Sequence, residues 1–242
     1  MISILLPVYN TPPQFLIPCL ESCLNQTIDD YEIVIVDNGS SLRGTIVVLE
    51  AYVANHDKIT ILKCPRHPPI EDKKNLAVAL NCGLRTCSYD LIARMDSDDL
   101  MLSHRLEKQL NYFQTNPHVD ILGAQLQFIH AKNQGTNHAP IVTKEMALST
   151  YWFINHPTVM YRRSKILEIG GYKESPQYFA EDYDLWLRAM ASGMQIHNLP
   201  DVLIQYRLHS GNLTRQTEKH PQYISLMNEA REKLKAGRSD IS

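Results

Sequence analysis

The sequence predicts an α/β fold in which helices cover both faces of a mostly parallel central sheet. Short apolar runs alternate with amphipathic segments through the first hundred residues, and polar or acidic residues follow the runs. Parallel strands that are buried on both faces appear as such continuous apolar runs, and helical crossovers connect them. The chain has 242 residues, of which 44% are hydrophobic and 21% charged, which fits one large globular domain or at most two small ones.

The first half of the chain alternates strands and helices with short connections. Apolar runs predict strands over residues 2–8, 32–36, 59–62 and 91–95. Helical spacing of apolar residues predicts the intervening helices over residues 15–24, 46–54 and 76–84. Right-handed crossovers between these strands produce a parallel sheet.

The second half is less regular. We expect helices over residues 105–113 and 182–190, strands over 119–129, 156–161 and 202–206, and a polar loop over 132–140. From residue 220 onward the chain is polar with a helical tendency, and it ends in a tail that we expect to be frayed.

Charge and cysteine content exclude several classes of protein. With 24 Lys and Arg against 26 Asp and Glu, the net charge of −2 gives no electrostatic case for binding nucleic acid. The five cysteines are odd in number and have no Cys-x-x-Cys spacing, which favours free thiols in a reducing, cytoplasmic compartment. The sequence contains no run of about 18 apolar residues, so we expect no transmembrane segment and at most a peripheral association with a membrane.

Three carboxylates occur within the tetrad Asp96-Ser97-Asp98-Asp99, directly after the predicted strand 91–95. Unpaired carboxylates are costly to bury, and the carboxyl end of a central strand opens into the ligand crevice of an α/β sheet. Acidic oxygens there suit Mg²⁺ or Mn²⁺ with substrate phosphates. A solvated acidic turn or a helix N-cap is the alternative. A calcium loop is excluded, because Met101 stands where that loop requires glycine.

Several segments in a fixed order resemble family 2 glycosyltransferases, which use nucleotide sugars and have the GT-A fold. The resemblance is carried by residues 2–10, 33–41, 74–83, 96–98 and 181–186 and covers about residues 1–210. Agreement of separate motifs is more specific than any one motif. The sequence departs from the family pattern at Asn38, where many members have Asp, and at Leu80, where Arg is common.

The resemblance implies a role for each motif. Asp182 is implied as the general base, and the metal ligands as Asp98, Asp96 and His209. The implied donor-binding residues are Pro7, Tyr9, Asn10, Asp37, Asn38, Lys74, Asn81, Arg94, Asp96 and Ser97. The implied acceptor-binding residues are His156, Glu181 and Trp186.

Structural explanations stand beside these roles. An Asx turn explains Asp37 equally well. The helix dipole alone accounts for acidic residues such as Asp182 at a helix start. His156 could be a satisfied histidine at a strand start, and His209 could lie in a surface loop.

The implied activity is inverting transfer of a hexose from a UDP-sugar to a hydroxyl acceptor, expected to be a glycan, with Mn²⁺ or Mg²⁺ as cofactor. Residues 1–215 would form the GT-A domain, with residues 1–100 binding the nucleotide sugar and 101–215 binding the acceptor. Residues 216–242 would form a C-terminal helix and tail. The alternatives are an inactive nucleotide-sugar-binding module and a nucleotidyltransferase, although residues 11–14 are not the Gly-rich phosphate loop that the latter needs.

Overall fold

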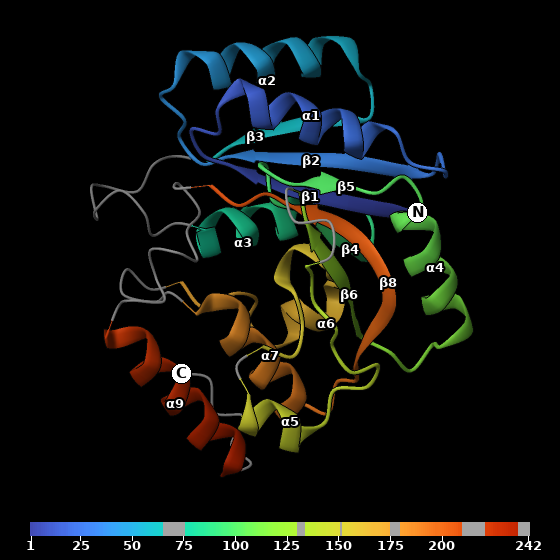
Figure 1. Ribbon diagram of the computed structural model, residues 1–242. Coiled ribbons are helices and arrows are strands. Elements are labelled where there is room, and N and C mark those ends of the chain that lie inside the picture. The colour runs from blue at the N-terminus through green and yellow to red at the C-terminus, as the bar shows by residue number, and fades with distance from the viewer. Residues whose placement is uncertain (65–75, 130–133, 151, 175–179, 210–220, 237–242) are drawn as a thin grey trace.

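The computed structural model describes residues 1–64, 76–129, 134–150, 152–174, 180–209 and 221–236. Within them an eight-stranded sheet has the order β3-β2-β1-β4-β7-β6-β8-β5, with helices above and below it (Figure 1). The strands are β1 (Ile2–Val8), β2 (Tyr31–Asp37), β3 (Ile59–Lys63), β4 (Leu91–Arg94), β5 (Leu100–Met101), β6 (Ile121–Phe128), β7 (Met160–Arg162) and β8 (Ile196–Tyr206). The helices are α1 (Pro13–Leu24), α2 (Arg43–Asn55), α3 (Leu76–Thr86), α4 (Arg105–Thr115), α5 (Lys144–Ser149), the 3₁₀ helix η1 (His156–Thr158), α6 (Arg163–Glu168), α7 (Glu181–Ala191) and α9 (Pro221–Lys235).

The predicted mostly parallel sheet is confirmed. β3, β2, β1 and β4 run parallel to one another, and β6 and β8 run parallel to each other. β7 is antiparallel to both of its neighbours, and β5 is antiparallel to β8 at the edge. The carboxyl ends of β1, β2 and β4 therefore meet at the same edge of the sheet, where the motifs 2–10, 33–41 and 96–98 lie.

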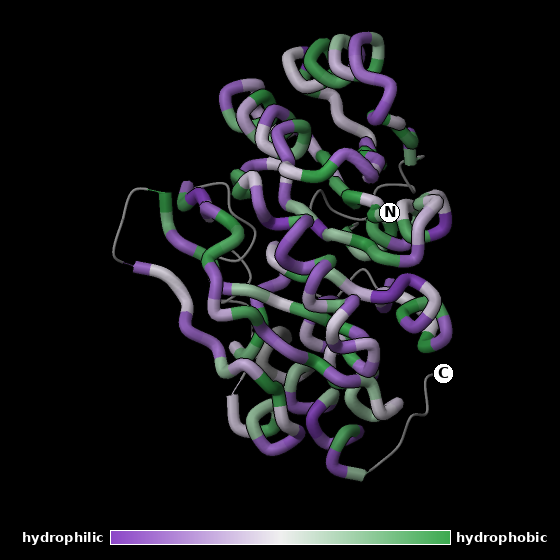
Figure 2. Tube along the Cα trace, turned by 90° about the vertical axis from the view of Figure 1, so that its right-hand side faces the viewer, coloured by the Kyte–Doolittle hydropathy of each residue, from purple (hydrophilic) through white to green (hydrophobic). Residues whose placement is uncertain are grey.

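Each face of the sheet has its own hydrophobic core. In β1, Ile4 and Leu6 point toward α1 and belong to one core, whereas Leu5 points toward α3 and belongs to the other. This alternation follows from the two-residue period of a strand. The helices carry alternating hydrophobic and hydrophilic stretches in Figure 2, as expected for helices with one buried side. Helices on both faces, as predicted, shield the sheet.

The structure differs from the sequence-based expectations mainly in the second half. Residues 156–161 were expected to form one strand, but they begin as η1, and only then does β7 start. Pro157 explains the difference, because proline has no N–H for a strand ladder. β8 begins six residues before the expected strand 202–206. The elements β5, α5 and α6 were not predicted, and part of the expected loop 132–140 lies outside the described residues.

The helix α9 packs against α7 on the lower side of Figure 1. Met227 and Leu234 are buried there, and Arg231 Nε donates a hydrogen bond of 2.7 Å to the Tyr183 hydroxyl. No helix among the described residues is both long enough and apolar enough to cross a bilayer.

Candidate active site

The tetrad follows β4 after one residue, Met95, and its first two residues are held by neighbouring elements. Arg94, the last residue of β4, donates from Nη1 to Asp96 Oδ2 at 2.5 Å. The Ser97 hydroxyl lies 2.6 Å from that of Thr11, which follows β1. The tetrad is therefore tied to the strand before it and to the loop after β1, at the shared carboxyl edge of the sheet.

Asp98 and His209 form a close pair. His209 Nε2 lies 2.8 Å from Asp98 Oδ2, and Arg207 Nε donates 2.8 Å to the Asp98 carbonyl. Burial and the charge of Asp96 raise the pKa of Asp98, and His209 partly opposes them. The pair brings a carboxylate and an imidazole to one point, which are donor types that Mn²⁺ accepts. Groups of three or more such side chains, close enough to hold a metal, are absent from the described part of the chain.

Asp99 is fully buried and has a structural contact. Its Oδ1 accepts a 2.8 Å hydrogen bond from the Arg207 backbone N–H, while Oδ2 is buried without a hydrogen-bond partner in the described chain. Burial, followed by the charges of Asp96 and Asp98, raises the pKa of Asp99 well above its usual value. An N-cap role for the tetrad is wrong, because the cap of α4 is His104, with no side-chain cap bond. Asp99 instead fastens the tetrad to the end of β8.

The ends of β1 and β2 form adjoining turns. Asn10 has a positive φ of 49°, and its Oδ1 accepts hydrogen bonds from the backbone of Ser41 at 2.7 Å and Leu42 at 2.8 Å. Asp37 Oδ1 accepts a hydrogen bond of 2.9 Å from Ser40 N, three residues along the chain, whereas an Asx turn bonds the residue two along. A local turn contact of Asp37 is thus present, although it is not the expected Asx turn. Asp37 is buried, and the neighbouring Tyr9 is 37% exposed.

Other predicted donor residues lie deeper. Pro7 is inside β1, paired with Val36 of β2. The Asn81 amide is buried, and it bonds the backbone of Tyr172 at both ends, donating to its carbonyl at 2.7 Å and accepting from its N–H at 2.8 Å. Asn38 donates its backbone N–H to the Val8 carbonyl. Lys74 lies outside the described residues.

The helix α7 begins with two carboxylates in different surroundings. Glu181 is buried, and burial together with the charge of Asp182 raises its pKa to about 8. Asp182 is more exposed, and its Oδ1 accepts 2.7 Å from the Tyr183 N–H. Burial raises the pKa of Asp182, while that hydrogen bond and the Arg94 charge oppose the rise. Arg94 acts electrostatically on both Asp96 and Asp182, so the tetrad and the start of α7 lie near each other.

His156 and Trp186 lie beneath this surface. His156 Nδ1 is 3.9 Å from Asp182 Oδ2, and Nε2 is 3.0 Å from the Tyr172 hydroxyl. Burial and the Arg94 charge lower the pKa of His156 well below its usual value, so the imidazole is neutral. Trp186 is 2% exposed and packs edge-on against His156, so it lies in the core below the site. Sequence reasoning missed Tyr172, because a tyrosine between Gly171 and Lys173 carries no motif signal.

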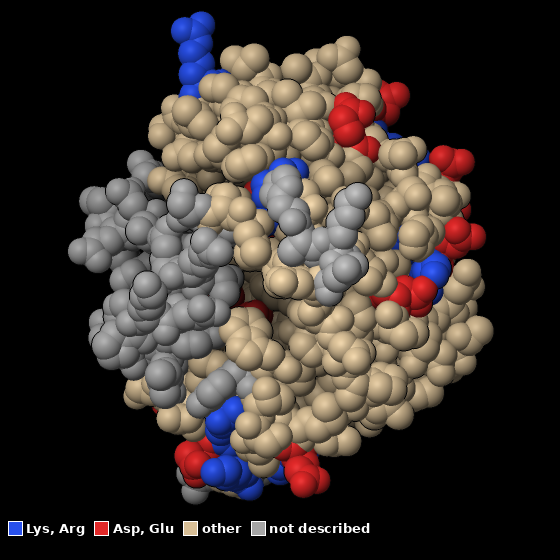
Figure 3. All heavy atoms as spheres, viewed as in Figure 1, with Lys and Arg blue, Asp and Glu red and all other residues tan. Residues whose placement is uncertain are grey.

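Exposure separates the carboxylates into two groups. The side chains of Asp96, Asp98 and Asp182 are 26%, 25% and 32% exposed, whereas Asp99 is 0% and Glu181 9% exposed. The first three can reach a ligand, and the last two can act only through neighbours. Figure 3 shows a hollow near the centre of the drawn face, with acidic side-chain atoms visible inside it.

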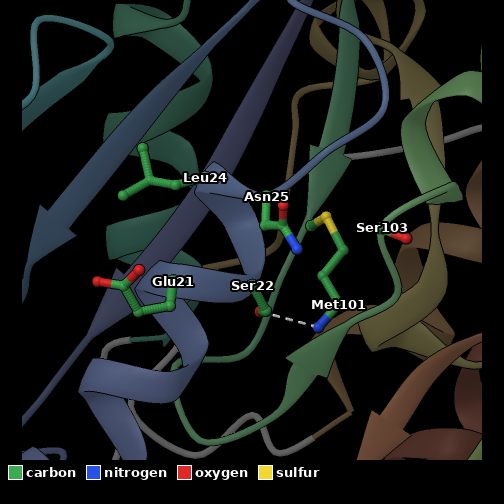
Figure 4. Close-up of a pocket in the computed structure, with 6 residues that line it drawn as sticks. All are labelled: Glu21, Ser22, Leu24, Asn25, Met101 and Ser103. Atoms are coloured by element: carbon green, nitrogen blue, oxygen red, sulfur yellow. Dashed lines mark hydrogen bonds between the residues drawn. The ribbon is translucent and has the colours of Figure 1, made fainter.

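A separate surface pocket of about 490 Å³ lies at the last turn of α1 and β5. Figure 4 shows Glu21, Ser22, Leu24, Asn25, Met101 and Ser103 around it, with the Met101 N–H donating 3.0 Å to the Ser22 hydroxyl. None of the predicted site residues lines this pocket.

Comparison with known proteins identifies relatives over most of the chain. The model of glycosyl transferase family 2 matches residues 3–170. The chain is 34% identical over 214 residues to the amylovoran biosynthesis glycosyltransferase AmsE of Erwinia amylovora, with 87% of this chain and 77% of AmsE covered. It is 31% identical over 215 residues to the O-antigen biosynthesis glycosyltransferase WbnJ of Escherichia coli, with 87% and 80% covered.

Solved structures share the fold at low sequence identity. S. aureus TarS 1–349 in complex with UDP-GlcNAc superposes with a TM-score of 0.77 at 18% identity, over 100% of this chain and 68% of that chain. The mannosyltransferase PcManGT from Pyrobaculum calidifontis, in complex with GDP-Man and Mn²⁺, gives 0.70 at 18% identity, over 93% and 62%. The fold is therefore GT-A, as the sequence predicts, and the chain is a glycosyltransferase that belongs to glycosyl transferase family 2.

Proposed function

We propose that this glycosyltransferase moves a hexose from a UDP-sugar to a hydroxyl group of a glycan, with inversion at the anomeric carbon. The observation that carries the proposal is the division of the carboxylates by exposure. The accessible Asp96 and Asp98 lie at the carboxyl edge of the sheet, and the accessible Asp182 lies at the start of α7. This arrangement supports one site in which Asp96 and Asp98 bind the leaving group and Asp182 is a base at a separate position.

Asp182 is the proposed general base. Its carboxylate takes the proton of the acceptor hydroxyl as that oxygen forms a bond to the anomeric carbon, and the bond from this carbon to the diphosphate breaks with release of UDP. Attack from the side opposite the leaving group inverts the configuration. Arg94 supports this role, because its positive charge favours the ionised form of Asp182.

Asp98 and His209 are the proposed metal ligands, with Asp96 beside them. An oxygen and an imidazole nitrogen lie 2.8 Å apart there, and these two side chains would hold Mn²⁺, or less readily Mg²⁺, which prefers oxygen ligands. A divalent cation held there would act as a Lewis acid toward the leaving diphosphate. The relative PcManGT was solved with Mn²⁺, which supports the use of a divalent ion.

The turns after β1 and β2 are the proposed site for the nucleoside. Tyr9 has an exposed ring for stacking on the base, and Asp37 would accept from the uracil N3–H or a ribose hydroxyl. UDP is favoured because TarS was solved with UDP-GlcNAc and because a 29% identical relative from Escherichia coli is named a UDP-Gal-dependent β-1,3-galactosyltransferase. The free state of all five cysteines supports a reducing, cytoplasmic location.

The test is the Asp182→Asn variant in a transfer assay with a panel of UDP-hexoses. We expect the transfer rate to fall by about 10²–10⁴-fold, the usual contribution of a general base, while calorimetric UDP binding in Mn²⁺ stays unchanged. The matched control is Asp201→Asn, because Asp201 is also 32% exposed but pairs with Lys108. Transfer by Asp182→Asn at near wild-type rate would refute the base, and UDP binding that is indifferent to Mn²⁺ would refute the metal site.

A further inference from the structure

Three buried side chains form a hydrogen-bonded row that ends at the proposed base. The Tyr161 hydroxyl on β7 lies 3.4 Å from the Tyr172 hydroxyl, which lies 3.0 Å from His156 Nε2. On the other side of the same imidazole, Nδ1 lies 3.9 Å from Asp182 Oδ2. Tyr161 and Tyr172 are at most 1% exposed, and His156 is 8% exposed. Water therefore has little access to the row, and its polar groups must satisfy one another.

The protons in this row have one favoured direction. Tyr172 has a single hydroxyl proton and two neighbouring acceptors, and a neutral imidazole nitrogen is a far stronger base than a phenol oxygen. The imidazole is also the nearer acceptor, so Tyr172 donates to His156 Nε2. Tyr161 can then donate to the Tyr172 oxygen. Since a neutral imidazole carries one N–H, the proton of His156 is placed on Nδ1, the atom that faces Asp182.

We propose that His156 is a positioning residue that directs its Nδ1–H at Asp182, and that Tyr172 and Tyr161 fix this tautomer. The proposal rests on the proposed role of Asp182 as base. A separation of 3.9 Å is longer than a direct hydrogen bond, but such contacts are often long before substrate binds and tighten in the complex. The N–H favours the charged carboxylate and holds its Oδ2 in place, while the Tyr183 N–H holds Oδ1.

The surroundings make such a donor useful. Three elements bring ionisable groups to Asp182. Its own helix supplies Glu181, and η1 supplies His156. β4 supplies Arg94, whose partner Asp96 also acts on Asp182. Burial and the charge of Asp96 disfavour the charged form of Asp182. The hydrogen bond from the Tyr183 N–H and the charge of Arg94, which already pairs with Asp96, only partly offset them. The opposite tautomer of His156 would present a lone pair to this carboxylate and repel it.

The test measures how the transfer rate depends on pH in Tyr172→Phe. Loss of the Tyr172 proton frees Nε2 to carry the imidazole hydrogen, so we expect the acid limb of the kcat profile to move up by about one pH unit, roughly a tenfold change in the ionisation constant of the base. The matched control is Tyr183→Phe, which removes the buried hydroxyl of the residue that follows Asp182 in the chain; this hydroxyl bonds Ala147 and Arg231. Its acid limb should stay at the wild-type pH.

His156→Asn separates positioning from packing. An asparagine amide N–H₂ can occupy the place of the Nδ1–H without help from the tyrosines. We therefore expect His156→Asn to keep the wild-type acid limb, and Tyr172→Phe to add no shift in that background. Two results would overturn the proposal. One is a shift of the acid limb that Tyr172→Phe still causes in the His156→Asn background. The other is a Tyr172→Phe enzyme that is slower than the wild type but has its acid limb at the wild-type pH.

Direct observation of the tautomer covers the case in which Tyr172→Phe folds poorly. In wild-type protein with ¹⁵N-labelled histidine, the His156 signal is assigned by its loss in His156→Asn, and its two nitrogen shifts report which atom is protonated. Protonation at Nδ1 is expected, and protonation at Nε2 would refute the proposal. Failure of the base assignment is recognised separately, because Asp182→Asn would then remain active whichever tautomer His156 adopts.

Discussion

Replacing Asn81 by alanine tests whether this residue supports the site or binds the donor. The resemblance implies donor binding, yet both ends of the Asn81 amide bond the backbone of Tyr172 within the core. A second contact from Nδ2 reaches Glu174 Oε1 at 2.7 Å. Asn81→Ala leaves a buried N–H and a buried C=O of Tyr172 unpaired, at about 1–3 kcal/mol each. We expect the free energy of unfolding to fall by about 2–4 kcal/mol, because some water can enter the space.

Urea unfolding followed by circular dichroism measures this loss as a lower midpoint with an unchanged slope. The control is Asn55→Ala, because Asn55 is exposed on α2 and bonds only the Ala51 carbonyl within the described chain, so its change should stay within about 0.5 kcal/mol. At temperatures where the Asn81→Ala enzyme is still folded, its KM for the donor should resemble that of the wild type. An unchanged midpoint together with a much higher donor KM would refute the structural role and restore the donor contact.

Three further outcomes are expected. His209→Ala should raise the Mn²⁺ concentration for half-maximal transfer by at least about tenfold, because losing even a residue that only supports a metal ligand weakens metal binding by about that factor. An unchanged Mn²⁺ requirement would exclude His209 as a ligand. Gly83→Ala should lower the melting temperature although alanine favours helices, because its Cβ would lie 2.1 Å from Leu5 Cδ1; a higher melting temperature would contradict this packing. The pKa of Glu181 is raised to about 8 in the folded protein, so between its unfolded pKa and pH 8 the native state holds a proton that the unfolded state has lost. The contribution of this proton binding to stability is therefore largest below the unfolded pKa of Glu181 and is lost as the pH rises toward 8. Glu181→Gln should therefore gain stability relative to wild type between pH 5 and pH 8 in urea unfolding, and a constant difference would contradict the shift.

The first hundred residues could be predicted well because each of their long elements has a clear period. The runs that became β1 and β2 are apolar and are bounded by turn residues, and the spacing of Leu76, Leu80 and Leu84 is that of one helix face. The tetrad was predictable for the same reason, since its position follows from the end of β4. The family, the GT-A fold and the glycosyltransferase class were all confirmed.

The second half was harder because its short elements depend on tertiary contacts. β5 has two residues, and α5 and α6 have six each, which is too short for a period to appear. The first half of β8 was missed because Pro200 argues against a strand, and the register shifts between Gly123 and Leu126 show that its pairing with β6 is irregular there. The contacts of His156 could not be predicted at all, because its partners come from α7 and from the segment after α6, which are distant from it in the sequence.

Arg105 shows how the two sides of the site are held in one position. It is fully buried, and burial lowers its pKa to about 9, so it stays charged at neutral pH. Its Nη2 donates to the carbonyls of Arg94 at 2.8 Å and Val159 at 3.1 Å, which end β4 and follow η1. Gln109, one turn later, accepts from Arg105 Nε and donates to the Thr158 carbonyl. The strand that ends at the tetrad and the turn that carries His156 thus share one anchor in α4. The proposed function requires a fixed spacing between the metal ligands and the residues around the base. The hydrogen bonds of Arg105 and Gln109 to backbone carbonyls connect β4 to the turn that carries His156 without depending on the side chains of the proposed site.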